Sequence, residues 1–492
     1  MLDKYIRTKT FSYIYSILLF AIAVCIIFVG WDQYTDWHVI RVKPALYTGI
    51  QILVLITSLM LVVSSRLTDA MLPAMLLVVL ATACYDSADE FTAPGFIWVA
   101  IPAVFAAVFH FIKYRGKFKI GRSFWGLCGV TAAVTLGGLG TISVAEYFNG
   151  TSLFYVFGLG IGMIAFYLLV KSQVDTDEPQ NIARIMYMVG LLSAFSIYWM
   201  YITNWDMAIK YGGMLHPQFG NNLSTLMMMA LPFTFYYASK RCVDFISTII
   251  IYGAIAISGS RGGLLMGTVE MAILLVFFSI LGQKGKRGIA NRIIYIGSLL
   301  GAAVALWTLL PTIARLGNFI DNVSGMSRIE IIKTVFNNIM NSEDTGDTRV
   351  RLFGRMISDF KSNPLFGTGL GYTGNTDLYA PVKGAMCWYH MWLPQIVGSL
   401  GTLGILTYGY QLVDRFVIVF KNSKFLMLTF FMSYVGLLLM SQLNPGEFCP
   451  MPYAALAATY FAFMEKDDDA FPLKKLIKKR KKDKPIENTV NG

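Results

Sequence analysis

Charge is the first thing that this sequence lacks. Only 14% of its 492 residues are Asp, Glu, Lys or Arg, whereas 55% are hydrophobic, and the mean hydropathy is +0.57. A soluble protein of this length could not cover so much apolar surface, so the composition excludes that class. The sequence therefore predicts an integral membrane protein.

Clustered cysteine and histidine are missing as well. The chain has six Cys and four His, with no C-x-x-C pair and no His/Cys spacing that is typical of a zinc site. We therefore expect no metal and no cofactor. The net charge of +12 would suggest nucleic acid as a partner in a soluble protein. Basic loops and a basic tail explain it better in a membrane protein, so no nucleic acid is expected.

What the sequence has in abundance is long apolar runs, about fourteen of which approach the roughly 20 residues that span a bilayer. The first run has a basic leader but no small-residue cleavage site, which indicates a retained helix rather than a signal peptide. The expected fold is an all-α polytopic bundle of about 12–14 helices. The spans are expected near residues 11–30, 45–64, 68–85, 94–112, 123–145, 152–170, 185–203, 219–239, 243–259, 263–281, 293–310, 392–413, 425–442 and 450–464.

Lysine and arginine set the orientation of these spans. If both termini are cytoplasmic, 29 of the 41 Lys and Arg residues fall in cytoplasmic segments. Apart from the long loop 311–391, the opposite side then has only four. The positive-inside rule therefore predicts a multi-pass protein with both termini in the cytoplasm. The basic tail "KKLIKKRKKDK" is most simply a contact with anionic membrane lipid.

Arg261 departs from this charge pattern. It lies in "ISGSRGGLL" (257–265), alone on the outer side between two spans. A helix end is wet, so the position is allowed, whereas deeper burial would cost on the order of 3 kcal/mol on insertion scales. The charge alone leaves two explanations open: a topological accident or an anion-binding site.

The outer loop 311–391 carries most of the polar information, and loops of this length usually have a function. In "RVRLFGRMISDFKS" (349–362), apolar residues recur at helical spacing. This predicts an amphipathic helix that lies on the membrane surface or caps a cavity. Arg349 and Arg351 fall in its first turn, where anions bind. Asn363-Pro364 is expected to end it.

Two further features follow that helix. Gly367, Gly369 and Gly371 in "NPLFGTGLGY" predict a tight turn, which either only turns or lets backbone N–H groups approach a phosphate. No strand precedes it and no helix opens at once, so a dinucleotide-binding fold is excluded. His390, next to Tyr389 at the predicted outer interface, is the nearby side chain that can take a proton near neutral pH.

Taken in order, these motifs resemble the bacterial O-antigen ligase and O-antigen polymerase superfamily. They are "GSRG" (259–262), the arginine helix that runs into "NPLFGTGLG" (363–371), and His390 followed by Gln395, Gly401 and Gly404. The upstream "HPQFGNNLSTLMMMALPF" (216–233) is similar to that family's asparagine-bearing helix. The resemblance covers residues 215–404, and the first half of the chain shows only generic spans.

The resemblance implies a GT-C-like glycosyltransferase in the bacterial cytoplasmic (inner) membrane. It would transfer a glycan from undecaprenyl diphosphate to a hydroxyl of an acceptor glycan on the outer face, without a nucleotide sugar, cofactor or metal. Arg261 and Arg349 are expected to bind the donor diphosphate, with Arg351 as the alternative to Arg349. His390 is expected to activate the acceptor. Met391 stands where the family has asparagine, which leaves the orientation of His390 open.

Glu270 and His216 are further candidates. Glu270 lies about 10 Å below the outer surface, and an intramembrane carboxylate is by default functional. His216 is a second histidine on the outer side. Together with Tyr389, these residues are candidates for binding the acceptor or for supporting the catalytic groups.

The expected organisation has four parts: N-terminal spans (1–214), the ligase/polymerase core with its outer loop (215–413), C-terminal spans (414–464) and the tail (465–492). The expected function is a surface polysaccharide (O-antigen or capsule) polymerase. A ligase that uses a lipid or cell-wall acceptor stays open, as does a lipid-linked oligosaccharide flippase, which would more typically show two similar halves and short outer loops. A chain-length regulator or a flippase is the candidate protein partner.

Overall fold

The computed structural model describes most of the chain from residue 120 onward and a smaller part before it. The described stretches are 9–30, 120–144, 155–171, 178–203, 217–281, 286–316, 323–340, 349–370, 391–422, 424–443 and 452–465, with shorter pieces that include 104–108, 389 and 447–448. Apart from 104–108 and scattered helical positions, the predicted spans 45–64, 68–85 and 94–112 lie outside the described residues.

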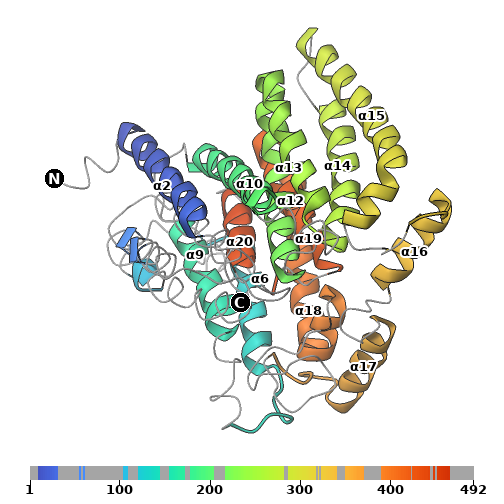
Figure 1. Ribbon diagram of the computed structural model, residues 1–492. Coiled ribbons are helices and arrows are strands. Elements are labelled where there is room, and N and C mark those ends of the chain that lie inside the picture. The colour runs from blue at the N-terminus through green and yellow to red at the C-terminus, as the bar shows by residue number, and fades with distance from the viewer. Residues whose placement is uncertain are drawn as a thin grey trace, which may run out of the picture.

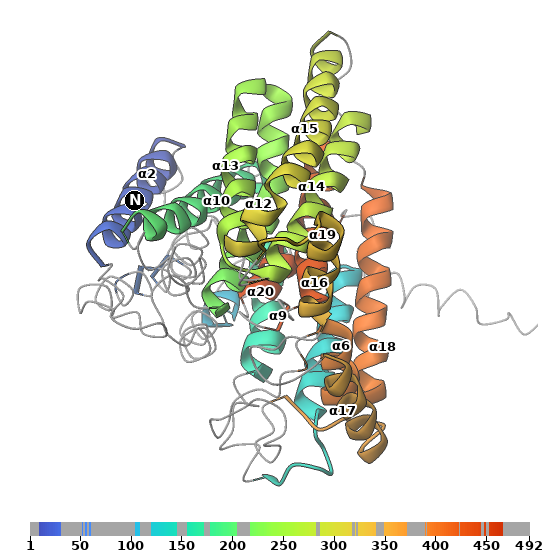
Figure 2. The same cartoon turned by 45° about the vertical axis from the view of Figure 1, so that its right-hand side comes forward.

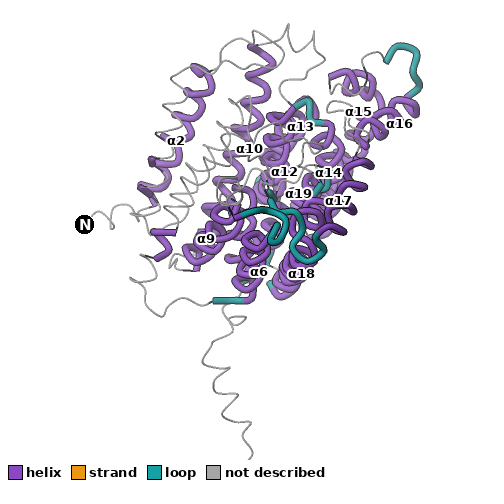
Figure 3. The backbone as a smooth tube through the Cα atoms, turned by 90° about the horizontal axis from the view of Figure 1, so that it is seen from below, coloured by secondary structure: helices purple, strands orange, loops and turns teal. Residues whose placement is uncertain are grey.

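Within these stretches the chain forms helices and loops, with no strand (Figures 1 and 3). The helices are α2 (Lys9–Gly30), α6 (Arg122–Leu136), η1 (Val156–Ile161, a π-helix), α9 (Gly162–Lys171), α10 (Glu178–Thr203), α12 (Pro217–Lys240), η2 (Cys242–Asp244, a 3-10 turn), α13 (Phe245–Ile257), α14 (Arg261–Leu281), α15 (Lys286–Leu316), α16 (Arg328–Met340), α17 (Arg349–Ser362), α18 (Trp392–Lys421), α19 (Phe425–Ser441) and α20 (Pro452–Met464). Among them, α10, α14, α15 and α18 are long and apolar enough to cross a membrane by length and composition, although the backbone of α18 breaks at Gly401. The all-α class and the membrane assignment are thereby confirmed at this coarse level.

Several helices begin or end away from their predicted bounds. α6 ends at Leu136, so the last part of the predicted span 123–145 is a turn, in which Gly138 has a φ of 79°. Glycine takes this left-handed conformation at little cost, which is why the helix can stop there. α15 continues to Leu316, and the long connection therefore begins later than predicted.

The long connection contains a second helix, α16, that the sequence reasoning overlooked. Its start is a capping box: the Ser327 N–H donates to Glu330 Oε2 over 2.7 Å, and the Glu330 N–H donates to Ser327 Oγ over 3.3 Å. Hydrogen bonds that the Glu330 carboxylate accepts from the Ser327 hydroxyl and backbone N–H hold the pKa of Glu330 below its ordinary value. The S-x-x-E pattern at 327–330 is a helix-start signal that predicts this element.

α12 lies at the centre of the bundle, where it packs against α10, α13, α14 and α19 (Figure 1). All of its residues from 222 to 236 are buried. Lipid tails are as apolar as leucine, so close backbone approach, rather than apolar burial, drives helix association in a membrane. A Cβ placed on Gly190 of α10 would lie 2.5 Å from Ala230 Cβ of α12. Small residues of this kind set how closely α12 meets its neighbours.

α18 reverses its direction at Gly401. In a continuous helix, Trp392 and Tyr408 would be about 24 Å apart along the axis, yet their ring centroids are 6.3 Å apart. Gly401 has φ 59° and ψ −153°, a conformation that favours glycine. Residues 392–400 (α18a) and 402–421 (α18b) therefore form a helical hairpin. The prediction of one continuous span over 392–413 was wrong, and Trp392 lies beside the middle of α18b.

α6 packs against α18b along its whole length, and the two helices are antiparallel (Figure 2). At one end, a Cβ on Gly137 would lie 2.8 Å from Leu400 Cδ2. At the other end, Arg122 Nε pairs with Asp414 Oδ1 at 2.9 Å. This pair places the start of α6 beside the last turns of α18b.

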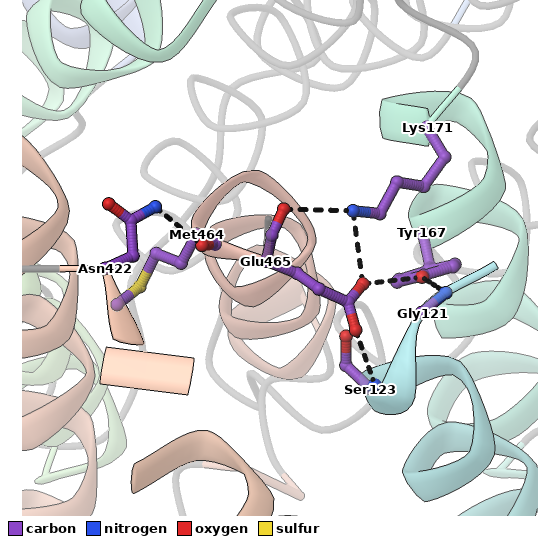
Figure 4. Close-up of polar contacts among 7 residues, drawn as sticks. All are labelled: Gly121, Ser123, Tyr167, Lys171, Asn422, Met464 and Glu465. Carbon is purple, nitrogen blue, oxygen red and sulfur yellow. Dashed lines mark hydrogen bonds and ion pairs between the residues drawn. The ribbon is translucent and has the colours of Figure 1, made fainter. Parts of the chain in front are cut away.

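Glu465, directly after α20, ties three helices together at the Arg122 end (Figure 4). Its carboxylate accepts hydrogen bonds from the Ser123 N–H at 3.0 Å and the Tyr167 hydroxyl at 2.8 Å. Lys171 Nζ lies 3.1 Å from the same carboxylate. The start of α6, the end of α9 and the end of α20 therefore meet at one end of the bundle. The charge pattern predicts that this end faces the cytoplasm.

Candidate functional site

Arg261 is the first residue of α14 and is half-buried. Gly259, with a φ of 76°, turns the chain after α13. Ser260 then caps α14: its Oγ accepts the Gly263 N–H over 2.8 Å and donates to Asn221 Oδ1 over 2.6 Å. The arginine thus lies at a helix N-terminus, where backbone N–H groups and the helix dipole favour an anion.

α12 places a polar cluster beside this helix start. Ser224 Oγ and Ser258 Oγ lie 2.9 Å apart, and the Tyr453 hydroxyl donates to the Asn222 backbone carbonyl over 2.7 Å. Asn222 is 2% exposed, and its Nδ2 has no hydrogen-bond partner among the described residues. A buried donor of this kind can serve a ligand oxygen. Asn222 and Ser224 belong to the segment 216–233 on which the family resemblance also rests.

The glycine run after α17 packs its backbone against the α18 hairpin. The Thr368 N–H donates to the Gly398 carbonyl over 3.0 Å, and the Gly369 N–H donates to the Ser399 carbonyl over 2.7 Å. A Cβ on Gly367 would lie 2.4 Å from the Ser399 carbonyl carbon. These N–H groups are occupied by protein carbonyls, so they do not fit a phosphate cradle. Gly367 and Gly369 instead allow close backbone packing on the hairpin, which neither explanation included, while Gly371 lies outside the described residues.

The same loop completes the break in α18. The Thr402 N–H donates to the Pro364 carbonyl over 2.8 Å, directly after Gly401. Asn363 ends α17 as predicted, and its Nδ2 donates to the Leu139 carbonyl over 2.7 Å. Segments that are far apart in the sequence therefore meet at this end of the bundle: the end of α6, the glycine run and the α18 bend.

Tyr389 joins α17 to α18a. It is fully buried, its hydroxyl donates to Asp359 Oδ2, and its N–H donates to Gln395 Oε1 over 3.1 Å. Arg355 holds the other carboxylate oxygen of Asp359 at 3.0 Å. Of the two roles considered for Tyr389, this arrangement fits the supporting one, because the hydroxyl is occupied inside the protein.

α17 occupies the predicted residues, and it lies beside the segment that carries His390. Leu352, three residues after Arg349, packs in one apolar cluster with Tyr389. The first turns of α17 and the residue before His390 are therefore neighbours. The side chains of Arg349 and Arg351 lie outside the described residues.

His390 and His216 lie wholly outside the described residues. The neighbour of His390 is described: Met391 is the N-cap of α18a, with extended backbone and an 8% exposed side chain.

The segment after α19 connects Arg261 with this region. A Cβ on Gly262 would lie 3.4 Å from Leu443 Cβ, and Glu447 Oε2 accepts the Trp392 Nε1–H over 2.7 Å. The start of α14 thus contacts the end of α19, and the start of α18a contacts a residue four positions further along the chain.

The sequence reasoning missed Arg415 and Glu447. It treated Arg415 as one of the cytoplasmic charges, but this side chain is 4% exposed and pairs with Glu447 Oε1 at 2.8 Å. The guanidinium also donates to the Tyr434 hydroxyl and lies 5.0 Å from the Phe461 ring centroid. The available signal was a charge next to an apolar run, "RFVIVF" (415–420), which also fits the end of a span.

Glu270 is separate from the start of α14. It lies nine residues along the helix, about 13 Å from Arg261, and is fully buried. Neither carboxylate oxygen has a hydrogen-bond partner among the described residues. The group fits over Gly436 of α19, where a Cβ would lie 2.4 Å from Glu270 Oε1. The structure therefore does not bring Glu270 together with Arg261.

No protein-family model matches this chain, and no curated protein sequence matches it.

Proposed function

We propose that the protein is a membrane glycosyltransferase that transfers a glycan from undecaprenyl diphosphate to a hydroxyl of an acceptor glycan. The observation that carries the proposal is that segments on which the resemblance rests contact one another. Ser260, next to Arg261, donates to Asn221 of α12. The glycine run packs on the Gly401 bend, Gln395 accepts the N–H of Tyr389, the residue before His390, and α17 packs along α18.

Arg261 suits the donor end of this reaction. The leaving group is a lipid diphosphate, whose negative charge grows as the glycosyl bond breaks. An arginine fork binds phosphate oxygens bidentately, and a poorly hydrated site strengthens that interaction. The backbone N–H groups at the start of α14 add to it. Arg349, on the first turn of α17, is the proposed second arginine, with Arg351 as its alternative.

His390 suits the acceptor end. A neutral imidazole can take the proton of the acceptor hydroxyl as it attacks the sugar, and such general-base help is worth about 10²–10⁴-fold. This chemistry needs neither a nucleotide sugar nor a metal. The growing polysaccharide chain is the acceptor in a polymerase, which is the function we favour, and a lipid or cell-wall anchor is the acceptor in a ligase.

Arg261→Ala tests the proposal. We expect it to abolish glycan transfer by the purified protein from a polyprenyl-diphosphate-linked donor, while leaving membrane insertion intact. Arg261→Lys should rescue transfer poorly because a point charge lacks the fork. Arg328→Ala is the matched control: this arginine is on the same predicted side, at the start of α16 and outside the motifs of the resemblance, so activity should persist. Normal product from Arg261→Ala would remove the diphosphate-binding role.

Arg349→Ala and Arg351→Ala, assayed in parallel, identify the second arginine. The products identify the acceptor: glycans of increasing length indicate a polymerase, and a single transfer to a lipid or cell-wall acceptor indicates a ligase. If an intact lipid-linked oligosaccharide only crosses the bilayer, the protein is a flippase and the proposal fails.

A further inference from the structure

Glu447 bridges two halves of the α18 hairpin from outside it. Its Oε1 accepts Arg415 Nη1 over 2.8 Å, and its Oε2 accepts Trp392 Nε1 over 2.7 Å. Arg415 is on α18b and Trp392 is the first residue of α18a. One carboxylate therefore fixes the start of α18a against α18b.

This bridge lies inside the protein. Glu447 and Arg415 are each 4% exposed, and the guanidinium lies 4.4 Å from the Tyr434 ring centroid. A buried ion pair contributes little net stability over an apolar replacement, but losing one partner leaves an uncompensated charge. Such a pair therefore adds little to the stability of the fold, but it fixes how the segments that carry its two partners are aligned.

The bridge fixes the start of α18a, which follows His390 in the sequence. Before His390, Tyr389 is held by Asp359 of α17 and by Gln395. After it, Trp392 is held by Glu447. The described residues on the two sides of His390 are thus both anchored, Tyr389 to α17 and Trp392 to the buried ion pair.

We propose that Glu447 is a positioning residue: through Trp392 it holds the turn 389–391 in place, and with it the histidine that acts on the acceptor. This rests on the proposed function. Glu447 would touch neither substrate, so its loss should lower turnover and leave the donor's KM nearly unchanged. Misplacement of a catalytic group by about 1 Å costs on the order of 10²-fold.

Trp392→Phe is the first test, because it keeps an aromatic ring at this position and removes the indole N–H that Glu447 accepts. We expect turnover to fall by about tenfold or more in a protein that still folds, because Arg415 still pairs with Glu447. Trp307→Phe is the matched control: this tryptophan is 51% exposed on α15 and should behave like the parent. If turnover per folded molecule stays at the parent's value, so that activity falls only because less protein is folded, the role is purely structural and the proposal is overturned.

A charge cycle separates folding from positioning. Glu447→Leu should destabilise the protein because it leaves Arg415 unpaired, and Glu447→Leu with Arg415→Met should restore the melting temperature. Turnover should stay low in the double variant, since leucine offers no acceptor for the Trp392 indole N–H. Recovery of turnover together with stability would overturn the positioning role.

A third readout does not depend on activity. A cysteine at Met391, which is 8% exposed, should react slowly with a maleimide in the otherwise unchanged protein and several-fold faster when Trp392→Phe is added. Mass analysis of the peptide that contains residue 391 separates it from the native cysteines. If the parent shows no transfer, the proposed function fails while this labelling still decides whether the bridge holds the turn. An unchanged labelling rate overturns the inference.

Discussion

At the scale of the residue, Arg261 and Arg415 show when the position of a charged side chain in a membrane protein can be predicted from the sequence and when it cannot. Arg261 stands out in sequence because it breaks the positive-inside pattern, and its helix-end position follows from the glycines and serine around it. Arg415 obeys the pattern, yet it is buried against Glu447, 32 positions away. Partners that far apart leave no local signal, which is why this pair could not be predicted.

His390 gives a residue-scale prediction about catalysis. His390→Ala should lower the single-turnover rate by about 10²–10⁴-fold and change donor affinity only slightly, because a base acts on the acceptor and not on the diphosphate. Single-turnover kinetics beside a donor-binding assay measure the two effects separately. Equal losses in both would make His390 a binding residue.

Glu270 gives a prediction about stability. Its carboxyl is fully buried without a hydrogen-bond partner among the described residues, so Glu270→Leu should raise the free energy of unfolding by about 1–3 kcal/mol. Glu465→Leu is the contrast: its carboxylate has three partners, and the change should cost about 3–5 kcal/mol. Denaturant unfolding in detergent measures both. Destabilisation by Glu270→Leu would indicate a partner that these contacts do not include.

At the scale of the element, the sequence predicts helices well and their ends less well. α12, α14, α17 and α19 occupy the expected residues, because long apolar runs and Asn363-Pro364 are local signals. The reversal in α18 escaped prediction, since "GSLGTLG" (398–404) reads equally as a glycine-rich membrane helix. What decides it is the glycine run, in which the N–H groups of Thr368 and Gly369 donate to the carbonyls of Gly398 and Ser399, just before the bend. That pairing is non-local, and only the folded chain shows it.

Gly401→Ala tests the reversal. A Cβ there would lie 2.7 Å from the Gly367 backbone nitrogen, at a φ of +59°, so we expect a loss of about 2 kcal/mol or more of unfolding free energy. Gly409→Ala on the same helix is the control, because nothing lies within 4 Å of its Cβ position. It should be neutral or stabilise by about 0.5–1 kcal/mol. Similar effects at the two positions would argue against the hairpin.

At the scale of the whole molecule, the two ends of the bundle differ in chemistry. One end gathers Arg122, Lys171, Asp414 and Glu465 in ion pairs. The other end joins the turn after α6, the glycine run and the α18 bend through backbone hydrogen bonds. The contacts establish which segments share an end. The lysine and arginine distribution then predicts which end faces the cytoplasm, because positive charge is retained on that side.

Two thiols at opposite ends test this orientation. Gly140→Cys places a thiol in the turn after α6, where nothing lies within 4 Å of the Cβ position, and we expect a membrane-impermeant maleimide to label it in intact cells. The native Cys242, which is exposed between α12 and α13, should be labelled only after the membrane is permeabilised. Mass analysis of the two peptides keeps the other cysteines from confusing the result. The opposite pattern would invert the bundle, put Arg261 on the cytoplasmic side and remove the basis for a donor that is used at the outer face.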